Sequence, residues 1–299
     1  MYNDRPSATA ILILKSMVFL LLDPRLNHLV PEEIGKISTQ FLKTRTLNEK
    51  KFIRISKNKF LRNLVCLAER LLLPGIILHY VLRKRYIEEA TFSIMQKGEV
   101  SQVVILAAGF DSLAFRLSEK FPKVIFIEVD HPATQEIKRR ISKELGLNTP
   151  NVFFVSVDFA KEKLGDKLLS TAHFSPQAKT LFIAEGITMY LDEDQIAKLF
   201  SFISSCTQTQ FIFTFMERQK DGTIDFKRTH SLVNLWLNLK REKFKWGISQ
   251  ERIADFLINQ KFSIEKLVLS NTLRTKYLST SLTNEPLAEG ECICVAKAN

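Results

Sequence analysis

The chain has 299 residues, 45% of them apolar, so it can bury a large core, and this composition argues against disorder as its main state. Its four scattered cysteines cannot form a disulfide framework, which indicates a reduced, cytoplasmic setting. The net charge of +11 is concentrated in residues 1–98, which hold 17 Lys/Arg against 8 Asp/Glu.

Residues 1–98 show helical periodicity without a clear strand, which predicts a helical cap packed beside the rest of the chain. The apolar runs at 11–22 and 71–82 are both shorter than the roughly 20 residues that a membrane-spanning helix needs. We therefore expect core or cap helices there and no transmembrane segment. Residues 99–299 are predicted to form a second, α/β domain.

A strongly basic stretch lies inside the predicted cap. It begins at Lys43, ends at Arg62 and carries eight basic residues and one acidic residue. One interpretation is a solvated helix face or loop. The other is a surface that attracts an anionic substrate, an acidic partner, nucleic acid or anionic lipid.

From residue 103 onward, short β-rich runs alternate with helical ones, a rhythm typical of a parallel sheet with crossover helices. Seven strands are expected, at residues 103–108, 124–130, 153–159, 180–186, 211–216, 262–269 and 291–298. Helices are expected at 133–145, before Gly146, and at 193–204, after Asp192 with Gln195 three residues later. Another is expected at 250–259, with Ser249 as its cap.

The first strand ends in the turn Ala107-Ala108-Gly109, where a glycine allows close approach of backbone to a ligand. The next strand ends in Asp130, 21 residues after Gly109, a spacing typical of an acid that binds ribose hydroxyls. The third and fourth strands reach Asp158 and Glu185. Because the carboxyl ends of parallel strands meet at one edge, these acids should line one crevice.

Several acids in one crevice repel a pyrophosphate but suit hydroxyls, amines and a cation. S-adenosylmethionine offers all of these groups, so it is favoured over a dinucleotide, and a vestigial site is the third interpretation. No metal is expected, because the five histidines never stand at ligand spacing with one another or with a cysteine.

The sequence resembles the leucine carboxyl methyltransferases and their bacterial relatives, a family of S-adenosylmethionine-dependent O-methyltransferases. The resemblance follows the order of the chain through SATA (7–10), LLDPRLNHLV (21–30), LRKRYIEEA (82–90), VVILAAGFDSLAFRL (103–117), FIEVDHP (126–132), LFIAEGITMYLDEDQI (181–196) and FKWGISQERIADFL (244–257). It implies a class I methyltransferase fold: a Rossmann-like, mostly parallel sheet of seven strands with an N-terminal helical cap.

The resemblance also implies roles for individual residues. Arg85 would bind the methionine carboxylate of S-adenosyl-L-methionine, Ala107 and Gly109 would lie against its methionine part, Asp130 would bind the ribose and Glu185 the α-amino group.

Further roles follow in the same way. Asp158 and Phe159 would hold the adenine, and Tyr190 and Arg83 would face the methyl acceptor, although Tyr190 is equally well interpreted as a packed aromatic residue. The chain departs from the usual G-A-G-x-D-T turn at Ala107 and Ser112.

After the third strand, Ala160 stands where the family has an arginine. The expected activity is methylation of a carboxylate to a methyl ester. A carboxylate is ionised at pH 7, so it needs no general base. A small-molecule acid is the first choice of acceptor and a protein C-terminus the second. A hydroxyl acceptor would need a base, for which His131 is the nearest candidate, although a helix cap is the favoured interpretation of that residue.

The alternative to an enzyme is a catalytically inactive binding module that keeps the fold and uses its basic stretch. Its partner would be nucleic acid or an anionic membrane. For the enzyme, no specific nucleic acid is expected, and contact of the basic N-terminal region with an anionic surface stays open.

Overall fold

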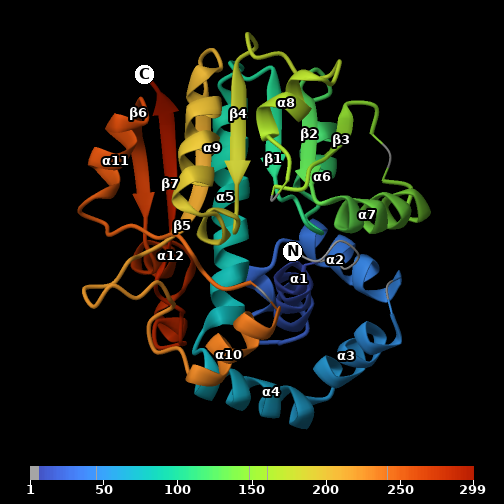
Figure 1. The fold of residues 1–299 in the computed structure, drawn as a ribbon. Coiled ribbons are helices and arrows are strands. Elements are labelled where there is room, and N and C mark those ends of the chain that lie inside the picture. The colour runs from blue at the N-terminus through green and yellow to red at the C-terminus, as the bar shows by residue number, and fades with distance from the viewer. Residues whose placement is uncertain (1–6, 45, 148, 160, 241) are drawn as a thin grey trace.

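A computed structural model describes residues 7–44, 46–147, 149–159, 161–240 and 242–299 of the chain. These residues form a seven-stranded sheet in the order β3-β2-β1-β4-β5-β7-β6 (Figure 1). The strands are β1 (Gln102–Leu106), β2 (Ile125–Asp130), β3 (Val152–Ser156), β4 (Thr180–Ala184), β5 (Gln210–Met216), β6 (Phe262–Val268) and β7 (Glu291–Ala298). β1 to β5 run parallel and β7 is antiparallel to both of its neighbours. The sheet expected from the sequence is confirmed.

The α-helices lie on both faces of the sheet and beyond the carboxyl ends of its parallel strands. They are α1 (Ala8–Leu21), α2 (Glu32–Thr44), α3 (Leu47–Lys57), α4 (Lys59–Leu72), α5 (Ile76–Gln96), α6 (Leu113–Lys120), α7 (Pro132–Glu144), α8 (Leu164–Leu169), α9 (Glu193–Ser205), α10 (Ser231–Lys240), α11 (Ile253–Asn259) and α12 (Ser270–Tyr277).

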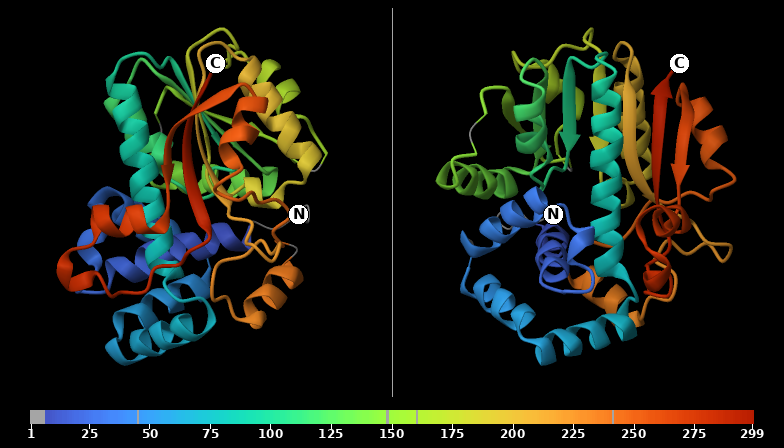
Figure 2. Two further views of the ribbon diagram at one scale, coloured as in Figure 1. Left: turned by 90° about the vertical axis from the view of Figure 1, so that its left-hand side faces the viewer. Right: turned by 180° about the vertical axis from the view of Figure 1, so that it is seen from behind.

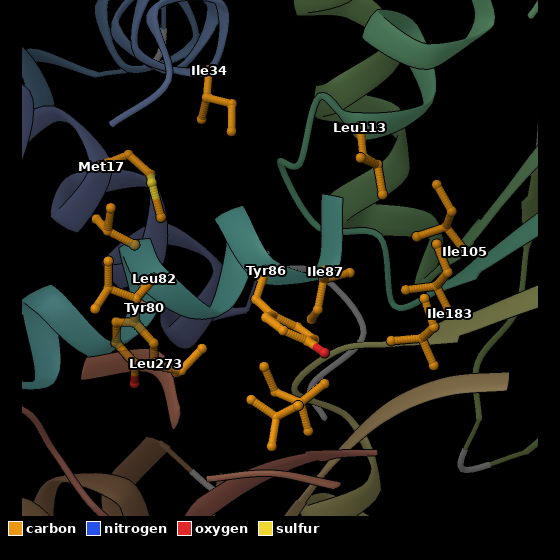
Figure 3. Close-up of a cluster of buried hydrophobic side chains, with 14 of the residues drawn as sticks. Met17, Ile34, Tyr80, Leu82, Tyr86, Ile87, Ile105, Leu113, Ile183 and Leu273 are labelled. Carbon is orange, nitrogen blue, oxygen red and sulfur yellow. The ribbon is translucent and has the colours of Figure 1, made fainter. Parts of the chain in front are cut away.

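Helix α5 covers one face of the sheet and α9 covers the other (Figure 2). The α5 side chains Leu82 and Ile87 belong to the same buried cluster as Ile105 of β1 and Ile183 of β4 (Figure 3). Met17 of α1 joins this cluster, so the first helix is attached to the sheet through α5. Phenylalanines dominate the opposite face, where Phe182, Phe200, Phe211 and Phe213 are fully buried.

Local sequence signals explain most helix ends. Asp192 and Gln195 form the expected capping box at the start of α9. Gly146 follows α7 with φ +69, a left-handed conformation that ends a helix at little cost for glycine. The expected cap at Ser249 is wrong: α11 begins only at Ile253, because the Ser249 carbonyl accepts from Arg252 in a preceding turn.

Helices α1 to α4 lie beyond the carboxyl ends of the parallel strands (Figure 1). Among the described residues no single helix is long and apolar enough to cross a membrane. Within the described ranges, the pair of α4 and α5 meets the limits of length and composition together, with a bend of 88° between the two helices. The division into residues 1–98 and 99–299 stays a prediction, since α5 packs directly on the sheet.

Candidate functional site

A cavity of about 660 Å³ opens at the carboxyl ends of the parallel strands, between the sheet and α1. Strand register explains its position, because Leu106 of β1 pairs with Val129 of β2 and with Ala184 of β4. The residues that follow these three strands therefore meet at one place. Most of the predicted site residues line this cavity: Arg83, Ala107, Gly109, Asp130, Asp158, Phe159, Glu185 and Tyr190.

The turn after β1 has a left-handed backbone at two residues. Gly109 has φ +51, and Ala107 has φ +50, the conformation that a glycine adopts without cost. A Cβ atom on Gly109 would lie 3.3 Å from that of Ala10 in α1, so the turn and the first helix are close. Ala107 thus holds a left-handed conformation at the cost of some backbone strain.

Asp130 fastens this turn to the end of β2. Its carboxylate accepts hydrogen bonds from the backbone N–H groups of Gly109 and His131. Desolvation raises the pKa of Asp130, and these two N–H donors only partly oppose it. The carboxylate is thus held at the cavity wall by backbone donors, without an ion-pair partner among the described residues.

A chain of ion pairs runs along the wall formed by α5. Lys84 Nζ lies 2.7 Å from Asp111 Oδ2 and 3.0 Å from Glu185 Oε2. Arg83 Nε lies 2.8 Å from Glu185 Oε1, and its Nη1 lies 2.6 Å from Glu291 Oε2. Burial alone would raise the pKa of Asp111, but Lys84 and Arg116 outweigh burial and hold it well below its usual range.

One donor in this chain has no partner in the described residues. Arg83 is 2% exposed, and its Nη2 atom makes no hydrogen bond. A buried guanidinium group normally satisfies its donors, because an unmade hydrogen bond costs free energy. Gly186, at φ +66, lies beside this guanidinium group, and a Cβ there would stand 3.7 Å from Nη2. Nη2 is thus an unpaired donor that is itself closed off from solvent.

The structure does not bring Arg85 to the cavity. Its Nε bonds Glu89 at 3.1 Å, and its guanidinium stacks on the ring of Tyr277 at 4.7 Å. Successive residues of an α-helix are turned by about 100°, so Arg83 and Lys84 face the site while Arg85 turns away. Arg83, expected on the acceptor side, is the arginine that lies beside Glu185.

The remaining predicted residues line the cavity from the segments that follow β3 and β4. Phe159 follows β3, and its carbonyl accepts from Gln195 at 3.1 Å. Asp158 lies 3.9 Å from His131 Nε2. Tyr190 Oη lies 3.4 Å from Thr9 Oγ1 of α1, and burial raises its pKa strongly. Ala160, where the family has an arginine, lies outside the described residues.

His131 is committed to structure through one ring nitrogen. Nδ1 accepts from the N–H of Ala133 and caps α7, as expected from the sequence. Nε2 lies 3.9 Å from Asp158 Oδ2, beyond hydrogen-bond distance. The capping bond leaves Nδ1 occupied and therefore unavailable as a general base.

Sequence reasoning missed one part of the cavity lining, which Leu239, Lys245 and residues between them contribute and which we call the roof. Glu242, just after α10, accepts from the backbone N–H groups of Ala8 and Thr9 and from Ser7 Oγ, at 3.0 to 3.1 Å. It also accepts from the Thr9 hydroxyl. More than 230 residues separate Glu242 from α1, so no local signal could have paired them. Leu239 and three lysines, Lys240, Lys243 and Lys245, line the same side.

No group of three or more His, Cys, Asp or Glu side chains within the described ranges could hold a metal ion. The charged groups at the cavity are instead spread along its walls. The site thus combines a left-handed turn, carboxylates and the α5 cations Arg83 and Lys84.

The family model of the leucine carboxyl methyltransferases matches residues 20–204, more than half of the chain. The chain belongs to the leucine carboxyl methyltransferase family. The matched part includes the turn after β1, Arg83 and Lys84 of α5, Asp130 at the end of β2 and Glu185 after β4.

Two curated relatives are similar in sequence to part of this chain. The "Putative S-adenosyl-L-methionine-dependent methyltransferase YktD" of Bacillus subtilis is 34% identical over 182 residues, which cover 55% of this chain and 58% of that protein. A similarly named protein of Mycolicibacterium smegmatis is 29% identical over 183 residues, 60% of this chain and 59% of its own. The chain thus spans somewhat more than half the length of these relatives.

Solved structures share the fold of this family member. A "putative methyltransferase" from Thermobifida fusca superposes with a TM-score of 0.58 over 92% of this chain and 98% of its own, at 12% identity. A DUF574 family protein from Streptomyces avermitilis also gives 0.58, over 88% and 97%, at 9% identity. The class I methyltransferase fold expected from the sequence is therefore present.

Proposed function

We propose that this chain is an S-adenosyl-L-methionine-dependent O-methyltransferase that converts a carboxylate to its methyl ester. The observation that carries the proposal is the meeting of the left-handed turn, Asp130 and Glu185 at one cavity in a member of this family. Arg83 and Lys84 line the same cavity, and their positive charge would attract the carboxylate of the cofactor's methionine part. The family and the names of its relatives support the same cofactor.

The cavity residues fit the other groups of S-adenosyl-L-methionine. Asp130 offers carboxylate oxygens for ribose hydroxyls, and Glu185 offers them for the α-amino group. The left-handed turn at Ala107 and Gly109 leaves room for close approach of a ligand to the backbone. When bound, the cofactor supplies an activated methyl group on a positively charged sulfur, which a wall of carboxylates favours.

A carboxylate acceptor agrees with the charges on the roof. Lys240, Lys243 and Lys245 line the cavity and attract an anion. A carboxylate is ionised at neutral pH, so the protein needs only to position it and exclude water. A hydroxyl acceptor would need a base, and Nδ1 of the nearest candidate, His131, already caps α7. A small-molecule acid is our first choice of acceptor, and a protein C-terminus the second.

The cofactor is tested by isothermal titration calorimetry with S-adenosylhomocysteine. We expect saturable binding that Asp130→Ala weakens at least tenfold, which is about 1.4 kcal/mol. Asp166→Ala, which removes an exposed carboxylate in α8 away from the cavity, should bind as the parent does. Absence of binding by the parent would refute the enzyme proposal.

The reaction is tested with S-adenosylmethionine labelled in its methyl group and a cell extract as the source of acceptors. We expect incorporated label to be released as methanol by mild base, because methyl esters hydrolyse under conditions that leave ethers and methylamines intact. Label that withstands base would assign the transfer to a different acceptor group.

A further inference from the structure

Helix α4 presents an unbroken apolar stripe to the solvent. Phe60, Leu64, Leu67 and Leu71 are 70%, 48%, 54% and 67% exposed. Their spacing of four, three and four residues places them on one face of the helix. The described helix has no buried residue at all. Its apolar side therefore adds nothing to the core, although single exposed leucines elsewhere would need no explanation.

Helix α10 adds a second exposed stripe. Leu232, Leu235 and Leu239 are 55%, 54% and 75% exposed and follow one another at three and four residues. The N–H of His230, just before α10, donates to the carbonyl of Leu72 at the end of α4. Both helices lie at the same end of the molecule in all views (Figures 1 and 2). We call the exposed residues of α3, α4 and α10 the α4–α10 surface.

This surface continues into the mouth of the cavity. Leu239, the most exposed leucine of α10, also lines the cavity, as do Lys240 and Lys243. A molecule bound to the α4–α10 surface would therefore lie next to the cavity opening.

The exposed charges of α3 and α4 are all positive. The two acidic residues of these helices are not exposed. Glu49 is 6% exposed and pairs with Lys15 at 3.6 Å, while Glu69 faces the start of α5 and accepts a hydrogen bond from the backbone N–H of Ile77. The exposed charged residues are Lys50, Lys51, Arg54, Lys57, Lys59 and Arg70.

An apolar stripe flanked by lysines and arginines suits a bilayer that contains anionic lipids. Such a helix lies in the interface, with its leucines among the acyl chains and its basic residues near the phosphates. A second copy fits less well, because a symmetric contact would bring the same positive patch of each copy together. Nucleic acid would engage the lysines but leave both leucine stripes in water.

We propose that the α4–α10 surface docks on an anionic membrane, with the apolar stripes of both helices inserted into its surface. The docking does not depend on the proposed methyl transfer. If both hold, an acid that carries an acyl chain would reach the cavity from the bilayer past Leu239.

The test is flotation of the full chain with vesicles of phosphatidylcholine alone or of phosphatidylcholine with phosphatidylserine. We expect the chain to float with the anionic vesicles and to bind the neutral ones at least tenfold more weakly. The variant Leu67→Gln/Leu71→Gln/Leu235→Gln should lose at least tenfold in binding. The variant Lys51→Glu/Arg54→Glu should lose about fivefold or more for each residue changed, and only on anionic vesicles.

A matched control replaces two equally exposed apolar residues far from this surface. Leu169 of α8 and Ile258 of α11 are 54% and 63% exposed, and Leu169→Gln/Ile258→Gln should float as the parent does. Every variant should retain the parent's affinity for S-adenosylhomocysteine, which separates loss of docking from loss of folding or of the cofactor site.

Three results would overturn the proposal. The first is failure of the parent to float with anionic vesicles. The second is undiminished flotation of both the leucine and the charge variants. The third is a parent dimer, seen by sedimentation equilibrium, that the leucine variant dissociates while vesicles do not bind; this would assign the surface to a second copy of the chain.

Discussion

Arg83 Nε and Lys84 Nζ bind the two oxygens of one carboxylate, Glu185, at 2.8 and 3.0 Å. Neighbouring residues of a helix point in different directions, yet here both reach the residue that follows β4. The Glu185 side chain is only 9% exposed. Loss of either cation would therefore remove half of the positive charge that compensates this buried carboxylate. The helix and the sheet are thereby fixed to each other at the candidate cofactor site.

The first prediction concerns which arginine of the R-x-R pattern binds the cofactor. Arg83→Lys keeps the positive charge but cannot bridge Glu185 and Glu291, because an ammonium lacks the planar fork, so Glu185 would lose one of the contacts that position it at the cavity. We expect affinity for S-adenosylhomocysteine, measured by calorimetry, to fall at least tenfold, or about 1.4 kcal/mol. Arg85→Lys is the matched control and should bind unchanged; the opposite ranking would restore the expectation for Arg85.

The second prediction concerns the left-handed alanine in the turn. Ala107 at φ +50 carries a strain of roughly 1–2 kcal/mol, which glycine would not have. Glycine also gains about 0.4–1 kcal/mol of freedom in the unfolded chain, which offsets part of the benefit. Ala107→Gly should therefore raise the free energy of unfolding by roughly 0.5–1 kcal/mol in urea titrations. A clear loss of stability would contradict the conformation described for this turn.

The third prediction concerns the pH dependence of stability. Burial raises the pKa of Glu69 from 4.5 to about 7, although backbone N–H groups at the start of α5 oppose the shift. The folded state thus holds this proton more tightly than the unfolded state. Its contribution is complete below about pH 4.5 and is lost as the pH rises through 7, by up to roughly 3 kcal/mol.

Glu69→Gln removes this titration. The free energy of unfolding of the variant, relative to the parent, should therefore increase between about pH 5 and about pH 8. Urea titrations at the two pH values check it, and Glu119→Gln, at an exposed carboxylate of α6, should show no such change. A relative stability that does not vary with pH would show that the Glu69 carboxyl titrates alike in both states.

The fourth prediction separates the acceptor side from the cofactor side of the cavity. Lys240 and Lys243 line the cavity from the end of α10 and the segment after it, whereas Arg83 and Glu185 line it from α5 and the end of β4. Lys240→Gln/Lys243→Gln should raise the KM for an acid acceptor roughly tenfold, because each lysine near an anion contributes about 0.5–1 kcal/mol. The affinity for S-adenosylhomocysteine should stay within twofold of the parent. If the variant instead lost only affinity for S-adenosylhomocysteine, the two lysines would lie beside the cofactor and not beside the acceptor.

The sequence alone predicted the sheet, the turn at Gly109 and the meeting of Asp130, Asp158 and Glu185. These features are local: apolar runs of strand length pair side by side, and the carboxyl ends of parallel strands share one edge whatever the rest of the chain does. The caps at Asp192 and Gly146 were predictable for the same reason, since a cap needs only its own turn of helix.

Only the tertiary structure decided which residues of the predicted cap face the site. The sequence pattern does not distinguish Arg83 from Arg85. The packing of α5 on the sheet turns Arg83 toward the cavity and Arg85 toward Tyr277. Glu242 reaches α1 across more than 230 residues. The leucines of α4 suit a buried helix, yet nothing in the described chain covers them, because burial depends on what a helix packs against and not on its own pattern.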